Sequence, residues 1–158
     1  LWRAIEYHIQ PTCVEHGVGI LPYTPLEQGL LTGRFQSAAD VPEGRMRTRF
    51  FSSVRPNVEH GEPGHEESLF AAIDAIRAIA DDAAIPMADL ALAWLLHQPG
   101  VASVPVGARR PEQIAKNAVA ASLSLTNDIL AALDAATTPL KDEIGTNPDH
   151  YQSVSRYR

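Results

Sequence analysis

A loop in the first quarter of the chain combines the residue types that suit a flat ring joined to a phosphate. Tyr23 offers an aromatic face and Thr24 a hydroxyl group. Gly29 and Gly33 let the backbone turn tightly or approach a ligand closely, and Arg34 adds a positive charge. The alternative is an ordinary transition from strand to loop, in which Tyr23 fills the core.

A second loop combines positive charge with the start of a helix. Gly107 ends an apolar run, Arg109 and Arg110 follow, and Pro111 is typical of a first helical position. Backbone N–H groups at a helix start, together with guanidinium groups, bind anions. Three polar residues of the predicted helix are spaced to share one face: Gln113, Lys116 and Asn117. The alternative is that this face is simply exposed to solvent.

Each of these loops follows a short apolar run that is typical of a buried strand. Residues 18–21 and 101–106 are bounded by glycine or proline, which favours strands buried on both faces. Strands that alternate with helices predict a parallel sheet, and ligands bind beyond the carboxyl ends of such strands. The order of elements therefore places both loops where chemistry is expected.

Apolar spacing and capping residues predict the helices. They are expected at 2–15, 67–84, 87–97, from 111 onward and from 126 onward. Pro11 should kink the first helix or divide it, and Gly17 should end it. Thr126 is a plausible N-cap, and Trp94 is most simply a core residue. The tail from Thr137 is polar and is predicted to be irregular.

Residues 34–66, the arginine-rich loop, show little periodicity. Two readings stay open for this loop: an anion-binding flap, or a solvated connection. Its five arginines are interleaved with Phe50 and Phe51. They are Arg34, Arg45, Arg47, Arg49 and Arg55.

The composition is that of one soluble globular domain. The 158 residues are 45% hydrophobic and 20% charged, with a net charge of −6. This acidic balance argues against nucleic acid as the main partner. Cys13 is the only cysteine, so a reducing, cytoplasmic location fits best. No stretch reaches the roughly 20 apolar residues of a membrane span, and the six histidines lack metal-ligand spacing, so neither membrane nor metal is expected.

Two motifs together resemble the aldo-keto reductases. The first motif (residues 22–35) matches the family pattern Tyr-(Ser/Thr)-Pro-Leu-x-x-Gly-Leu-Leu-Thr-Gly-(Lys/Arg)-(Tyr/Phe). The second motif (residues 104–117) is similar to the last barrel strand and the helix after it. Residues 90–96 and the sequence Asn147-Pro-Asp-His-Tyr fit in the same order. The resemblance implies an α/β fold, a (β/α)8 barrel of the TIM type, of which residues 1–158 form the last two to three strands and their helices.

The resemblance also implies that the fold binds NADPH. Tyr23 would stack on the nicotinamide ring, and Arg34 and Arg45 would hold the pyrophosphate. The path of the pyrophosphate would be lined by Thr24, Pro25, Leu26, Glu27 and Gln28. The adenosine 2′-phosphate and the adenine would be held by Gly107, Arg109, Gln113, Lys116 and Asn117. Lys116 departs from the family pattern, in which Glu or Gln faces the adenine.

The family's four catalytic residues (Asp, Tyr, Lys and His) belong to the first half of the barrel. A complete barrel needs roughly 250 residues, so the resemblance implies a parent enzyme that reduces a small carbonyl substrate. This chain would supply much of its cofactor site, no catalytic residue and no activity alone. Two alternatives stay open. One is a non-catalytic module that responds to NADPH, and the other is an inactive partial barrel whose apolar edges make it self-associate.

Overall fold

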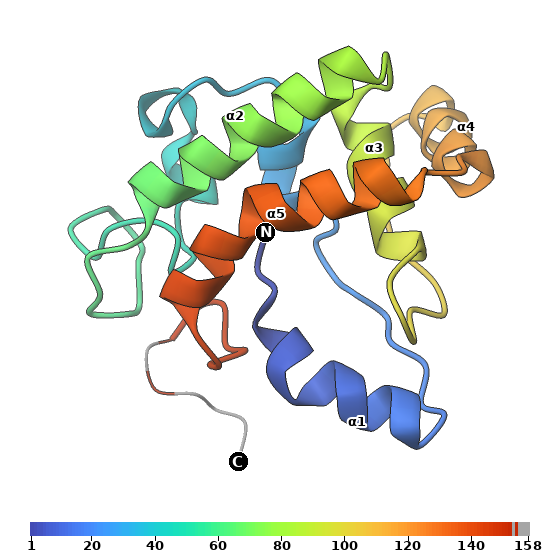
Figure 1. The fold of residues 1–158 in the computed structure, drawn as a ribbon. Helices are drawn as coiled ribbons and strands as arrows, with labels where there is room; N and C mark the ends of the chain where they lie inside the picture. Colours follow the sequence, from blue (N-terminus) through green and yellow to red (C-terminus); the bar gives the residue numbers. More distant parts are fainter. Residues whose placement is uncertain (153, 155–158) are drawn as a thin grey trace.

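The computed structural model describes residues 1–152 and 154 and consists of helices joined by long loops (Figure 1). Residues 153 and 155–158, which end the predicted domain 1–158 and its tail, lie outside the described residues. The α-helices are α1 (Ile9–Glu15), α2 (Glu66–Asp82), α3 (Met87–Leu96), α4 (Pro111–Val119) and α5 (Asn127–Ile144). The 3-10 helices are η1 (Ala4–Tyr7), η2 (Glu27–Thr32), η3 (Ala38–Asp40), η4 (Glu43–Arg45) and η5 (Ala120–Ser122).

A single parallel bridge stands where two strands were expected. Over the part of the chain that the structure describes, the only β pairing joins Ile20 to Val101. The N–H group of Ile20 donates to the carbonyl oxygen of Gly100 at 2.8 Å, and the carbonyl oxygen of Ile20 accepts from the N–H group of Ala102 at 3.0 Å. The parallel direction agrees with the prediction. Both motif loops therefore follow segments that run side by side in the same direction.

The predicted burial of these two segments on both faces is wrong. Val18 and Leu21 are more than half exposed, and residues 102–103 are exposed as well. A parallel ladder is extended and covered by neighbouring strands and crossover helices. The described residues supply no third strand, so the pairing stays limited to one bridge.

The first predicted helix forms as two pieces. η1 and α1 are separated at His8, whose backbone is not helical (φ −139°). Pro11 lies in the first turn of α1, where the backbone N–H has no partner within the helix, so the proline removes no hydrogen bond. Gly17 follows α1 with a φ of +64°, as its predicted role in ending the helix requires.

The long helices pack along the apolar faces that their sequences predict. α2 and α5 lie side by side across the molecule, and α3 contacts α2 (Figure 1). α2 buries Leu69, Ile73 and Ile76 in the core, and Leu133 of α5 joins them. Trp94 packs against this core, as predicted, and its Nε1 also donates to Asp134 at 3.0 Å.

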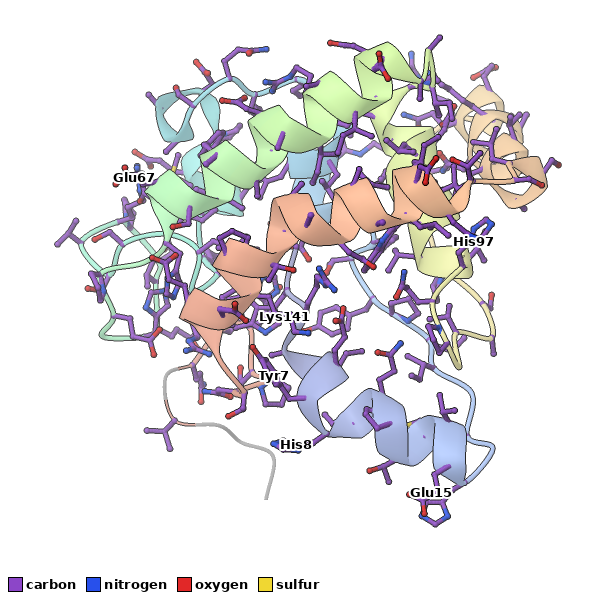
Figure 2. The ribbon with its side chains drawn as sticks, in the orientation of Figure 1. Tyr7, His8, Glu15, Glu67, His97 and Lys141 are labelled. Atoms are coloured by element: carbon purple, nitrogen blue, oxygen red, sulfur yellow. The ribbon has the colours of Figure 1, made fainter. Side chains whose placement is uncertain are left out.

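The irregular tail begins later than predicted, because α5 continues to Ile144. Pro139 lies inside this helix and removes one backbone donor. Burial of Leu140 and Ile144 against the core offsets that loss. Tyr7 and Lys141, on η1 and α5, point toward one another, with Nζ 4.8 Å from the ring centroid (Figure 2).

Thr126 caps α5 as the sequence predicts, because its hydroxyl oxygen accepts from the N–H group of Ile129 at 3.3 Å. We expect Thr126→Ala to lower the free energy of unfolding by about 1 kcal/mol. Urea denaturation measures this loss. Thr126→Ser, which keeps the hydroxyl group, should behave like the native protein, and an alanine variant of unchanged stability would contradict the assigned cap.

Among the described residues, no single helix is both long and apolar enough to cross a membrane. Residues 111–122 and 127–144 meet the length and composition only when joined, and the two parts are bent by 112°.

Candidate functional site

A cavity of about 130 Å³ opens beside the first motif. Its walls come from the segment around η1, the motif loop (residues 22–28), α3 and α5. Four predicted site residues line it: Tyr23, Thr24, Pro25 and Glu27. Pockets that enclose a drug-sized ligand measure roughly 300–1,000 Å³. This cavity is therefore large enough for only one end of an elongated ligand.

Tyr23 lines the cavity while its residue surface is 58% exposed. The alternative that Tyr23 fills the core is therefore wrong. An aromatic ring in this position is accessible from solvent and is close to the interior of the cavity. A flat ligand ring can stack on such a face.

The backbone of the motif loop is strained. Thr24, Glu27 and Gln28 have φ values of +48°, +45° and +53°, a region that non-glycine residues rarely adopt. Two turn hydrogen bonds of 2.8 Å hold this shape, from the N–H of Glu27 to the carbonyl of Thr24 and from Gly29 to Leu26. Strain of this kind persists only where surrounding contacts hold it, and it is concentrated at functional sites.

Arg45 of the arginine-rich loop contacts the motif loop directly. Its Nη1 donates to the carbonyl oxygen of Gln28 at 3.0 Å. A Cβ on Gly29 would lie 3.0 Å from the same nitrogen, so the glycine allows this close approach. The guanidinium group also lies 6.0 Å from the ring centroid of Phe35. Arg34 is exposed.

Arg49 and Arg55 fit neither an anion-binding flap nor a solvated connection, the two interpretations of the arginine-rich loop. Arg49 is buried, and its Nε donates to Glu62 at 2.8 Å. Arg55 pairs with Glu66 through its Nε at 2.6 Å, and this hydrogen bond lowers the pKa of the Glu66 carboxyl group. These cations hold the loop to the rest of the fold instead of facing solvent or an anion. Arg47 is exposed.

The carboxyl group of Glu27 is buried in the motif loop. Only 8% of the residue is exposed, and burial raises its pKa to about 7. Its Oε2 lies 3.5 Å from Nε2 of His150, a residue that is 3% exposed. Burial, and then repulsion by neighbouring positive charge such as Arg49, lowers the pKa of His150 to about 3. Both side chains are therefore uncharged between about pH 3 and pH 7.

His150 belongs to a compact turn (residues 147–152, the C-terminal turn). Oδ1 of Asn147 accepts from the N–H of Asp149 at 3.0 Å. Oδ1 of Asp149 accepts from the N–H groups of Tyr151 and Gln152 at 3.0 and 3.1 Å. Sequence reasoning gave His150 no role and Glu27 only a backbone role. Two Asx residues around a proline predict such a turn, but they do not predict what it packs against.

The second motif lies outside this cavity. Four of its predicted site residues are exposed: Gly107, Arg109, Gln113 and Lys116. Asn117 lines a separate hollow between α3 and α4. Oε1 of Gln113 accepts from the backbone N–H groups of Arg109 and Arg110 at 2.8 and 3.2 Å. The N–H groups that precede α4 therefore have an internal partner in this structure.

The Aldo/keto reductase family model matches residues 1–138. A putative voltage-gated potassium channel subunit beta of Schizosaccharomyces pombe is 32% identical over 131 residues, 82% of this chain and 37% of that protein. An L-glyceraldehyde 3-phosphate reductase of Escherichia coli O157:H7 is 34% identical over 127 residues, 78% of this chain and 34% of that protein. The NADH-specific methylglyoxal reductase of Escherichia coli K12 is 30% identical over 128 residues, 79% of this chain and 35% of that protein.

The chain belongs to the aldo/keto reductase family. It spans about a third of the length of the curated relatives it matches. The family has a TIM-barrel fold, whereas the described residues contain helices and one parallel bridge. The partial barrel thus stays a prediction.

Proposed function

We propose that this chain supplies part of the cofactor site of an NADPH-dependent reductase that converts a small aldehyde or ketone to an alcohol. The observation that supports this most strongly is the parallel bridge between Ile20 and Val101. Ligands of parallel sheets bind beyond the carboxyl ends of adjacent strands, which is where both motif loops begin. Family membership and the two reductases among the relatives point to the same chemistry.

The residues present fit an elongated anionic dinucleotide. The accessible ring of Tyr23 would stack on the nicotinamide, and Arg45 would keep the motif loop in shape around the pyrophosphate. Arg34 would approach the pyrophosphate from solvent. At the adenosine end the exposed cations of Arg109 and Lys116 would meet the phosphate. The cofactor supplies the hydride when bound, and the protein supplies position and electrostatics.

The proton donor of the reaction would come from the rest of the whole enzyme. Among the described residues, no Lys or Asp lines the cavity. Tyr7, Lys141 and Asp142 contact one another but are not part of its lining. We therefore expect the 158-residue chain alone to bind cofactor without turnover. A second candidate function is a non-catalytic module that responds to the cofactor. The relative named as a channel subunit favours a role as a subunit of a larger assembly. A self-associating partial barrel also stays a prediction.

Arg109→Ala tests the preference for NADPH. We expect the Kd for NADPH to rise about 10- to 100-fold, as loss of a hydrogen bond to a charged group implies, and the Kd for NADH to change little. Titration of the cofactor's fluorescence measures both constants. Arg47→Ala, which removes an exposed cation outside the two motifs, is the matched control. Equal losses for the two cofactors would refute the assignment, and the NADH-specific relative makes this comparison informative.

A further inference from the structure

His150 joins three parts of the molecule that are distant in sequence. Its ring centroid lies 4.6 Å from that of Trp2 and 5.2 Å from that of Phe50. Its Nε2 has no hydrogen-bond partner within the described residues, although it is buried. Buried polar atoms almost always have such a partner. Oε2 of Glu27 is 3.5 Å away, just beyond the usual range of a hydrogen bond.

Two arginines of the arginine-rich loop connect the C-terminal turn and the motif loop. The N–H group of Arg49 donates to the carbonyl oxygen of His150 at 2.9 Å, and its Nη1 donates to that of Asp149 at 3.0 Å. Arg45, on the same loop as Arg49, holds the carbonyl oxygen of Gln28. The C-terminal turn, the arginine-rich loop and the motif loop therefore hold one another in place. These contacts add to the two turn hydrogen bonds within the motif loop.

The surroundings of Glu27 favour its uncharged form. An uncharged carboxyl group can donate its proton to Nε2 of His150, whereas a buried carboxylate without donors is strongly disfavoured. Burial is the main cause of the raised pKa of Glu27. The other charged groups around this pair and its cavity are Arg3, Glu6, Arg45, Arg49 and Asp149.

We propose that the C-terminal turn is a proton-controlled latch for the motif loop. The uncharged Glu27–His150 pair holds the motif loop in the shape that accepts the cofactor. Loss of the Glu27 proton to solvent releases the motif loop. His150 is thus a positioning residue that acts through Glu27. Anionic pyrophosphate beside the loop also favours the uncharged carboxyl group, so binding of the cofactor and of the proton reinforce one another. The identity of the ligand rests on the proposed function, whereas the latch itself does not.

Trp2 reports on the latch without any cofactor, because its ring contacts that of His150. In a Trp94→Phe background, Trp2 is the only tryptophan. We expect its fluorescence to show a transition near pH 7 that disappears when Glu27→Gln is added. A transition that persists in the Glu27→Gln protein would overturn the latch. His150→Gln gives a second test, because it should shift the midpoint, and an unchanged midpoint would also contradict the proposal.

The cofactor provides an independent arm of the experiment. We expect the Kd of the native chain for NADPH to rise by at least about tenfold between pH 6 and pH 8.5, and that of Glu27→Gln to change much less. Protonation of the cofactor itself affects the Kd of both proteins equally, so it cancels when the two pH dependences are compared. If NADPH binds at no pH, the proposed function fails while the Trp2 transition still tests the latch. If both proteins show the same pH dependence, the latch is wrong.

Discussion

Phe50→Ala is expected to lower the free energy of unfolding by about 3–5 kcal/mol. Phe50 is fully buried at the junction of the N-terminal segment, the arginine-rich loop and the C-terminal turn. Its ring packs edge to face against Trp2 at 5.1 Å and against His150 at 5.2 Å. The alanine variant loses these two ring pairs and leaves a cavity in place of the Phe50 ring.

Urea denaturation at pH 6 measures this loss. Phe50→Leu is the matched control, because it keeps most of the apolar volume and removes only the aromatic contacts. We expect the leucine variant to lose clearly less stability than the alanine variant. Equal losses for alanine and leucine, or a loss below about 1 kcal/mol for alanine, would show that Phe50 does not hold these three segments together.

The pH dependence of stability is expected to reverse its sign between two variants of the Glu27–His150 pair. The pKa of Glu27 is about 7 in the folded protein, whereas its ordinary value, taken for the unfolded chain, is 4.5. Between these two pH values the folded state binds more protons than the unfolded state, so the free energy of unfolding falls as the pH rises. The pKa of His150 is about 3 in the folded protein, whereas its ordinary value, taken for the unfolded chain, is 6.5. Between these two pH values the unfolded state binds more protons, so the free energy of unfolding rises with pH. In the native protein the two slopes nearly cancel.

Each slope amounts to about 1.4 kcal/mol per pH unit. Between pH 4.5 and pH 7.5 we therefore expect Glu27→Gln to gain about 3 kcal/mol, and His150→Gln to lose about 3 kcal/mol, relative to the native profile. Urea denaturation at both pH values gives the comparison. Other carboxyl groups, such as Glu66, contribute equally to all three proteins. Three parallel profiles would contradict the buried, uncharged pair.

The sequence was most informative where structure depends on near neighbours. Apolar spacing predicted α2 to within a residue at its start, and the hydroxyl of Thr126 caps α5 as expected. The same local reasoning missed the end of α5, because this helix packs against the distant helix α2 and buries Leu140 and Ile144 in the core. It also predicted two extended strands where the described residues form only one bridge, because a strand needs partners that the sequence does not identify.

In the candidate site, too, the sequence predicted local features but not contacts between distant segments. The motif predicted that Tyr23 and Thr24 belong to one loop, and both line the cavity. It did not predict that Arg49 pairs internally with Glu62, since charge alone does not distinguish an ion pair from an anion site. Nor did it predict that Glu27 meets His150 from the other end of the chain. Contacts of this kind depend on the whole fold.

The central claim is that one dinucleotide contacts both motifs of this chain. Titration of the isotope-labelled 158-residue chain with NADPH, followed by amide NMR shifts, tests it most directly. We expect saturable shifts with one shared Kd in residues 22–28 and 107–117. Shifts confined to one motif, or different binding constants for the two, would contradict it.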